Sequence, residues 1–290
     1  LAGVYAAQGR PDLARDLYTR AIATLEAVSE PEFLAEAYVE LGDLELGEGR
    51  REQASALGRR GLELGERVGL ARARSQAHAL LGRVAEQRGQ LEQARQELQA
   101  ARQIDQAAGA HLRVAEQDLA LARLQLRSGQ RAEAARAAAA VAATAEAQSA
   151  RLLQLEALVL AGRCRQGLGE REPARALFEA AARVVEELRE RAAGDAADRQ
   201  RAFEAQVAPY LGLYELAAEE GDVARALGTA EQARARVLVE ALREGRVPLA
   251  LAPDERARES ALKDALASAE AGLEAEAERE APQPARLASS

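Results

Sequence analysis

The single cysteine of this chain is the first residue whose type could do chemistry. Cys164 follows His111 by 53 positions, and an imidazole can act as the base that turns a thiol into a nucleophilic thiolate. Cys164 lies in the helix-forming stretch LAGRCRQGLG, with no strand or oxyanion loop around it. We therefore interpret Cys164 as a small helix-packing residue and His111 as an exposed loop residue. An enzyme with Cys164 as its nucleophile is the less favoured alternative.

The remaining motifs predict no metal site and no cofactor. His78, His111 and one cysteine are too few for a cluster of the ligands that zinc prefers, and we interpret His78 as a structural residue. Gly47-x-Gly49 and Gly167-x-Gly169 resemble phosphate loops, but they follow no strand and lack a Gly-Lys-Ser/Thr ending. We interpret both as turns.

Arginines recur at a fixed spacing and could bind carboxylates. The series consists of Arg83, Arg123 and Arg163, with Gln76, Glu116 and Glu156 seven residues before them and Arg127 four residues after Arg123. We call the first three the arginine ladder. A guanidinium pairs with a carboxylate through two parallel hydrogen bonds, so the ladder could hold acidic side chains of a partner. The alternative is that Arg and Glu pair between neighbouring repeats, each pair contributing ~0–1 kcal/mol.

The elements that position this series recur with the same period. Glycine occurs every 40 residues and is followed five positions later by alanine, at Gly9/Ala14, Gly49/Ala54, Gly89/Ala94, Gly129/Ala134 and Gly169/Ala174. Gly221/Ala226 mark a sixth unit after an insertion of twelve residues. Self-similarity at this period indicates a solenoid of stacked supersecondary units. The alanines are expected where the second helix of each unit crosses the first.

Composition predicts that these units are helical. Only 3% of the residues are aromatic, and Ala, Leu, Arg, Glu and Gln dominate, which favours helices over strands. In the second unit we expect helices over Glu32 to Gly47 and Arg51 to Val68, the first ended by a left-handed Gly49.

The later units depart from this plan. We expect a helix in the alanine run from Ala132 to Ala145, and one from Pro173 to Arg191 with proline at its first position. The first helix of the sixth unit is expected to be interrupted at Pro209 by a kink or a restart, and the last repeat helix to span about Val223 to Glu244.

The predicted domain organisation is one superhelix with a C-terminal helix. The ranges are a superhelix over 1–245 with repeats at about 1–29, 30–69, 70–109, 110–149, 150–193 and 194–245, a linker over 246–253, a coiled-coil-like helix over 254–280 and a disordered tail over 281–290. Because the chain opens at Leu1 part-way through a repeat, we expect it to be a piece of a longer protein.

Charge and cysteine usage restrict the partners and the compartment. The net charge of −8 argues against a nucleic-acid partner, which requires a basic surface. No apolar run approaches the ~20 residues of a membrane span, so no membrane partner is expected. A single cysteine fits a reducing cytoplasm. The oligomeric state stays open.

The repeat pattern resembles the tetratricopeptide repeat. The first unit carries Leu1, Tyr5, Gly9, Ala14, Tyr18 and Ala21, and later units have Leu41-Gly42 and Leu81-Gly82 in the register of Leu1-Ala2. The usual period is about 34 residues. A HEAT-type repeat has the right length but does not explain the Gly-x4-Ala turn. The resemblance implies an all-α, right-handed solenoid, with the arginine ladder and its polar companions lining the concave groove.

The C-terminal third is similar to a narrower group. The stretch from Val184 to Leu242, and above all the run E-x-A-R-A-R-x-L-x-x-x-L from Glu231 to Leu242, resembles the segment before the protease domain of TPR–CHAT proteins. In those proteins a repeat array precedes a caspase-like domain, which this chain lacks. The resemblance implies a non-catalytic regulatory module that recognises a protein or peptide and is coupled to an effector, and the arginine ladder predicts that this partner is acidic. Alternatives are an effector-sensing solenoid of a signal-transduction ATPase or transcriptional activator, and a plain assembly scaffold.

Overall fold

The computed structural model describes residues 1–7, 9–28, 30–191 and 196–243, and all regular structure in these ranges is α-helical. The helices are α1 (Ala2–Ala7), α2 (Pro11–Val28), α3 (Pro31–Gly47), α4 (Arg51–Val68), α5 (Ala71–Gln87), α6 (Leu91–Ala107), α7 (His111–Arg127), α8 (Arg131–Ala147), α9 (Arg151–Gly167), α10 (Arg171–Arg191), α11 (Ala196–Glu219) and α12 (Val223–Arg243). The predicted all-α class is confirmed.

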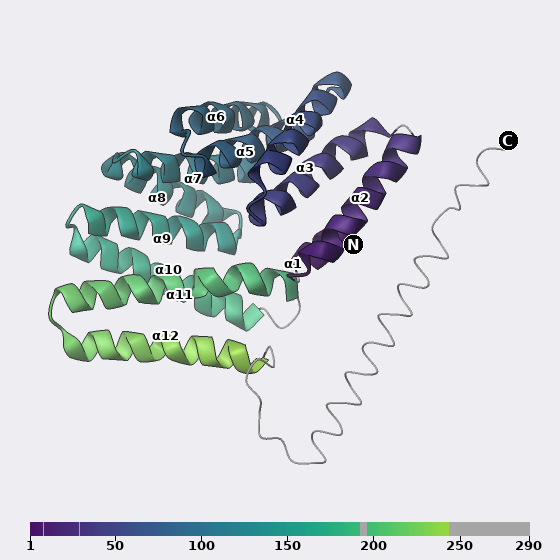
Figure 1. Ribbon diagram of the computed structural model, residues 1–290. Coiled ribbons are helices and arrows are strands. Elements are labelled where there is room, and N and C mark those ends of the chain that lie inside the picture. The colour runs from purple at the N-terminus through teal and green to yellow at the C-terminus, as the bar shows by residue number, and fades with distance from the viewer. Residues whose placement is uncertain (8, 29, 192–195, 244–290) are drawn as a thin grey trace, which may run out of the picture. The chain divides into compact units, whose positions relative to one another are not determined.

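Consecutive helices pack side by side in chain order (Figure 1). Each repeat pairs a first helix with a second helix, and several first helices of adjacent repeats also touch: α3 with α5, α7 with α9 and α9 with α11. This is the predicted solenoid of helix–turn–helix repeats. The chain forms two compact units, Leu1–Val237 and Leu238–Ser290, and only the end of α12 is described in the second. The predicted boundary at 245, the linker, the helix over 254–280 and the tail lie outside the described residues.

The turn after each first helix has the predicted left-handed residue. After α3, Gly49 has φ +76°, and the Arg50 N–H donates to the Glu45 carbonyl at 2.8 Å. This hydrogen bond satisfies a carbonyl group that the helix end would leave without a partner. Glycine adopts the left-handed conformation that the bond requires without strain. Ser149, with φ 57°, is the one non-glycine residue at positive φ among the described residues.

Two helix boundaries differ from the prediction at prolines. α10 begins at Arg171, so Pro173 is its third residue and not its first. α11 continues through Pro209, which excludes a restart there, and a kink stays a prediction. Proline inside a helix costs about 3 kcal/mol through a lost hydrogen bond and a steric clash. Pro209 is fully buried, and packing of the helix around it compensates for that cost.

Glycines on the first helices allow close approach of larger side chains. A Cβ at Gly42 would lie 2.5 Å from Leu80 and 3.5 Å from the Ala54 carbonyl oxygen, so α3, α4 and α5 meet at this point. Gly58 on α4 also borders Leu80, whose side chain fills the space that both glycines leave. The alanines that follow the turn glycines are all fully buried, as the helix crossing predicts: Ala14, Ala54, Ala94, Ala134 and Ala174.

The ring of Phe178 on α10 connects the fifth and sixth repeats. It is fully buried between Gly162 on α9 and Gly212 on α11. A Cβ would lie 2.7 Å from the ring at Gly162 and 2.5 Å from it at Gly212. Since an aromatic ring cannot bend away like an aliphatic chain, both positions require glycine.

A buried carboxylate joins the third and fourth repeats. Asp105 on α6 is 0% exposed and accepts hydrogen bonds from Ser75 Oγ at 2.6 Å and from Arg113 Nε at 2.7 Å. These partners lie on α5 and α7, so one side chain fixes three helices. A buried charge is tolerated when it is paired in this way.

We expect Gly212→Ala and Gly228→Ala to have opposite effects on stability. The new methyl group at Gly212 collides with the Phe178 ring, and such overpacking costs about 1–3 kcal/mol. At Gly228, inside α12, no neighbouring atom lies within 4 Å of the position that a Cβ would take. Alanine there should therefore raise the free energy of unfolding by about 0.5–1 kcal/mol through its higher helix propensity. Urea unfolding of both variants measures the difference. A Gly212→Ala variant as stable as the parent would contradict this account of the packing.

Asp105→Ala should destabilise the array by about 2–4 kcal/mol, because it leaves the Ser75 hydroxyl and the Arg113 guanidinium without their acceptor. The control is Glu63→Ala, which removes an exposed pair with Arg67 on α4 and should change stability by less than about 0.5 kcal/mol. Chemical denaturation provides both values. Equal losses would show that the buried network contributes nothing beyond a surface pair.

Candidate partner-binding face

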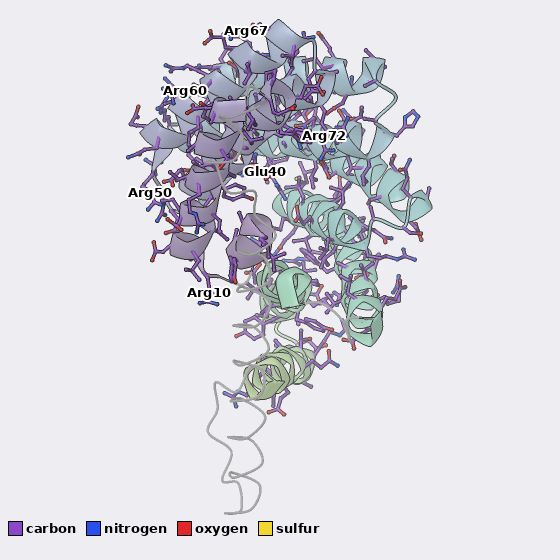
Figure 2. The ribbon with its side chains drawn as sticks, turned by 90° about the vertical axis from the view of Figure 1, so that its right-hand side faces the viewer. Arg10, Glu40, Arg50, Arg60, Arg67 and Arg72 are labelled. Atoms are coloured by element: carbon purple, nitrogen blue, oxygen red, sulfur yellow. The ribbon has the colours of Figure 1, made fainter. Side chains whose placement is uncertain are left out.

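The first helices α3, α5, α7 and α9 carry two series of charged or polar residues at equivalent positions. One series is Asp43, Arg83, Arg123 and Arg163, and the other is Glu36, Gln76, Glu116 and Glu156. We call the surface that they form the ladder face. Sequence reasoning missed Asp43 and Glu36, although subtracting one period from Arg83 and Gln76 would have found them. In Figure 2, Glu40 and Arg72 lie on the inner side of the array, and Arg50, Arg60 and Arg67 lie at its outer edge.

Two arginines of the ladder are paired with neighbouring repeats. Arg83 Nη2 lies 2.5 Å from Asp43 Oδ1, and Arg123 Nη2 lies 2.5 Å from Glu156 Oε2. All four side chains are between 42% and 46% exposed, so water screens both pairs. Arg163 is exposed and forms no ion pair with any described residue. The ladder therefore contains one unpaired cation, Arg163, and two cations that already have acidic partners. For Arg83 and Arg123 this agrees with the alternative that arginines and acidic residues pair between neighbouring repeats.

The other predicted members of the site have mixed surroundings. Arg127 Nη1 lies 3.2 Å from Glu86 Oε1 and donates also to the Glu86 carbonyl. Gln76 is half-buried. Arg72 lies 3.5 Å from Glu36, which adds a further pair between α3 and α5. Charges of both signs thus alternate across neighbouring first helices.

Glu116 has no ion pair with a described residue, although it lies among charges. Burial raises the pKa of Glu116; Arg113 and Arg83 lower it, and Asp105 and Glu156 raise it further. Glu116 is nevertheless an exposed residue of α7. The net direction of the pKa is upward because the lowering effect of the two arginines does not offset the partial burial of the carboxylate. Glu116 is therefore a carboxylate that would gain from a cation brought by a ligand.

Cys164 lacks the surroundings of a nucleophile. It is fully buried in α9, and burial raises the pKa of its thiol, against the lowering effect of Arg131 and Arg165. A raised pKa opposes formation of the thiolate. His111 is exposed at the first residue of α7. His78 has the expected structural contact, with its Nδ1 2.7 Å from Glu97 Oε2 on α6.

The glycine pairs suspected as phosphate loops are turns. Gly47 and Gly167 are the last residues of α3 and α9, and Gly49 and Gly169 are the left-handed residues that follow. Within the described ranges, no group of three or more His, Cys, Asp or Glu residues could hold a metal ion. No helix in those ranges is long and apolar enough to cross a membrane.

Comparison with known proteins gives the same architecture. Residues 1–67 match the family model described as Tetratricopeptide repeat. No curated protein matches the chain by sequence. The solved structure of BtubC (BKLC) from P. vanneervenii is similar with a TM-score of 0.67 and 16% identity, over 83% of this chain and 95% of that chain.

Two further solved structures share the fold. A Rap protein complexed with Competence and Sporulation Factor has a TM-score of 0.63 and 17% identity, over 82% of this chain and 63% of the Rap chain. A signal transduction ATPase with a tetratricopeptide repeat sensor, from Pyrococcus horikoshii, has a TM-score of 0.59 and 15% identity, over 84% of this chain and 38% of that one. The described part of the chain is therefore an α-solenoid of tetratricopeptide-like repeats.

Proposed function

We propose that this array is a regulatory module that recognises a protein or peptide segment on the ladder face. The observation that carries the proposal is the pairing state of that face. Arg163 is an exposed cation without an ion pair among the described residues, and Glu116 is a carboxylate with a raised pKa. A segment that brings a carboxylate to Arg163 and a cation to Glu116 would satisfy both groups. The sequence predicted an acidic partner, and the partner proposed here carries both acidic and basic side chains.

The existing pairs on the face do not prevent binding. Arg83–Asp43 and Arg123–Glu156 are almost half exposed, and such pairs contribute about 0–1 kcal/mol each. A ligand carboxylate that forms a bidentate contact with either arginine can therefore displace the internal partner at small cost. A buried pair such as Arg113–Asp105 could not exchange in this way.

Two structural neighbours support a recognition role. The Rap protein was solved with Competence and Sporulation Factor bound, and the ATPase carries its tetratricopeptide repeats as a sensor. The resemblance of Val184 to Leu242 to TPR–CHAT proteins further suggests coupling to a caspase-like effector in the cytoplasm. A sensor for a small effector is the second candidate, supported by the sensor repeats of the ATPase. A plain scaffold would bind no short ligand on this face.

Replacing Arg83, Arg123 and Arg163 with alanine should weaken binding of ladder-face peptides at least tenfold. The peptides are selected from a random library on the parent protein, and their Kd is measured by fluorescence anisotropy. Loss of the guanidinium groups removes the charge-assisted contacts, and helix content should be unchanged because all three side chains are exposed.

The matched control replaces Arg67, Arg95 and Arg136 with alanine. These three arginines lie on second helices and pair only within their own helix. We expect this variant to bind the selected peptides like the parent. Equal affinities for all three proteins would exclude the ladder as the binding site. Failure to select any peptide that binds the parent protein would favour the sensor for a small effector.

Glu116→Gln should increase stability at pH 7, by less than about 0.5 kcal/mol because solvent screens the partly exposed carboxylate. A pKa raised by folding means that the folded protein holds the proton more tightly, so the charged form costs stability above that pKa. The gain should shrink as the pH falls towards about 4 and disappear below the ordinary glutamate pKa of about 4.3, where the carboxyl group is protonated in both states. Urea unfolding of the parent and the variant at pH 4, 5.5 and 7 measures it. A gain independent of pH would show that the charge of Glu116 costs nothing.

A further inference from the structure

Two arginines near the end of α9 have no acidic partner. Arg163 is the last arginine of the ladder, and Arg131 is the first residue of α8. Both residues are exposed, and the guanidinium group of neither forms a hydrogen bond or an ion pair with a described residue. Arginines at the equivalent positions of other repeats do have partners, so each of these two positions has a local cause for the difference.

Arg163 lacks the partner that its neighbour on α7 has. Arg123 Nη2 lies 2.5 Å from Glu156 Oε2, on the following first helix. The residue of α11 that corresponds to Glu156 is Ala208, because the sixth repeat is displaced by the insertion of twelve residues. Alanine supplies no acceptor. Arg163 therefore keeps its positive charge on a face where the equivalent cation is neutralised.

Arg131 lacks a partner because it meets a glycine. Its counterparts in the second and fifth repeats reach a polar side chain on the following first helix. The pairs are Arg51 Nε with Gln87 Oε1 at 3.2 Å and Arg171 Nε with Glu219 Oε2 at 3.8 Å. The corresponding residue of α9 is Gly167, and a Cβ there would lie 3.1 Å from Arg131 Nε. Arg131 thus extends over α9 in the same way and finds no acceptor.

The two cations lie beside adjacent turns of α9. Gly167 follows Arg163 by four residues, and residues four apart are neighbours on the surface of a helix. Arg131, which covers Gly167, is therefore close to Arg163. Arg131 is also near enough to Cys164 of α9 to oppose the upward shift of the thiol pKa. We call Arg131 and Arg163 the cation pair.

Acidic side chains at the neighbouring positions are bound by other groups. Glu156 is paired with Arg123. Glu215 and Glu219 of α11 both accept a hydrogen bond from the Gln166 amide, at 3.5 and 3.2 Å. Because these carboxylates are engaged, an anionic group of a ligand can meet two guanidinium groups without displacing an internal partner.

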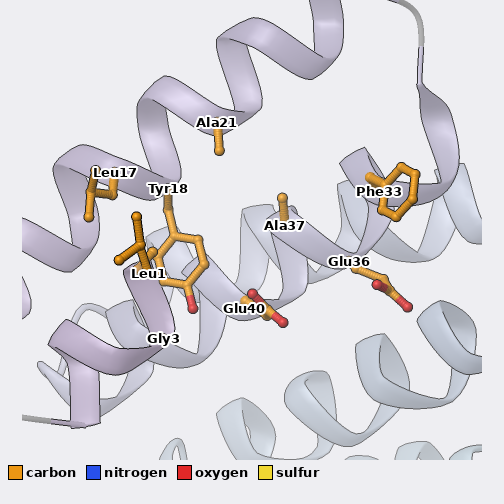
Figure 3. A pocket seen from close by; sticks show the side chains of 10 residues that line it. Leu1, Gly3, Leu17, Tyr18, Ala21, Phe33, Glu36, Ala37 and Glu40 are labelled. Atoms are coloured by element: carbon orange, nitrogen blue, oxygen red, sulfur yellow. The ribbon is translucent and has the colours of Figure 1, made fainter. Parts of the chain in front are cut away.

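The opposite end of the ladder face is acidic. α3 carries acidic residues and neither arginine nor lysine. Glu36 and Glu40 lie one turn apart on α3, where they line a cavity of about 400 Å³ between α2 and α3 (Figure 3). Negative charge at this end repels an anion. The face therefore directs the anionic group of a bound segment to α9.

We propose that the cation pair binds the phosphoryl group of a phosphorylated serine or threonine in the segment that the ladder face recognises. The proposal rests on the recognition role proposed above and adds the chemistry of the partner. A phosphoryl group carries a charge of about −1.5 to −2 at pH 7 and three strong acceptor oxygens, whereas a carboxylate carries a single charge. Two guanidinium groups match that charge, and each can form two parallel hydrogen bonds to phosphate. Arginine clusters recognise phosphorylated motifs in this way.

A phosphoserine peptide is the probe for this site. It is selected on the parent protein from a library with five random residues on either side of phosphoserine, and is then made in fluorescein-labelled phosphoserine and serine forms. We expect the phosphoserine form to bind the parent at least tenfold more tightly by fluorescence anisotropy, because charge-assisted hydrogen bonds are the strong ones. Arg131→Ala should reduce this preference to less than threefold. It should leave the Kd of the serine form unchanged, because Arg131 is not part of the ladder.

Arg136→Ala is the matched control for this substitution. Arg136 lies on the same helix, is exposed and pairs with Glu133 one turn away. This variant should keep the full preference for the phosphoserine form.

A second variant supplies the missing acid. Gly167→Glu places a carboxylate beside Arg131, as Glu219 lies beside Arg171, and should weaken binding of the phosphoserine form at least tenfold. Its control is Gly47→Glu, which adds the same charge at the equivalent position of α3. No neighbouring atom lies within 4 Å of a Cβ there, so the fold accommodates the change and the Kd should stay the same.

Equal affinity of the phosphoserine and serine forms, or a preference that persists in Arg131→Ala, would overturn the proposal. Inorganic phosphate is the second probe. If it displaces the peptide at concentrations as low as the Kd of the phosphoserine form, the ligand is a free anion and the assignment to a peptide is wrong. The recognition role fails separately, when the triple arginine variant binds the selected unphosphorylated peptides like the parent.

Discussion

Close contact between the first and second helices of each repeat is the constraint on which the rest of the array depends. The contact requires a fully buried alanine five residues after the turn glycine and, in three repeats, a glycine on the first helix. Gly82 accepts Leu98 and Gly162 accepts Phe178, each from the second helix of the same repeat. Gly42 borders Leu57 of α4 and also accepts Leu80 of α5, in the next repeat. In each case a large side chain on a neighbouring helix fills the space that the missing side chain leaves. Interiors packed at this density tolerate few other combinations.

This contact also fixes the angular position of every exposed side chain. Once the crossing residues are set, residues 40 apart must occupy equivalent places on successive first helices. Asp43 and Arg83 therefore become neighbours, and Glu36 comes within reach of Arg72. A shift of one residue in any first helix would rotate its charges by about a quarter of a turn, since an α-helix has 3.6 residues per turn. The ladder face is thus a consequence of the core and not an independent surface feature.

The same reasoning explains what could be predicted from the sequence. The period, the left-handed turn residues and the crossing alanines are local or strictly periodic, and the bounds of α4 were predicted without error. The start of α10 at Arg171 follows the 40-residue spacing of the starts of α4, α6 and α8, which the local rule for Pro173 overlooked. The continuity of α11 depends on packing around the buried Pro209, which a local rule does not contain. The positions of the ladder arginines follow from the period, but their pairing depends on which rotamers reach across neighbouring helices. Asp105 was not predicted as a junction because its partners, Ser75 and Arg113, lie on two other helices and follow no periodic signal.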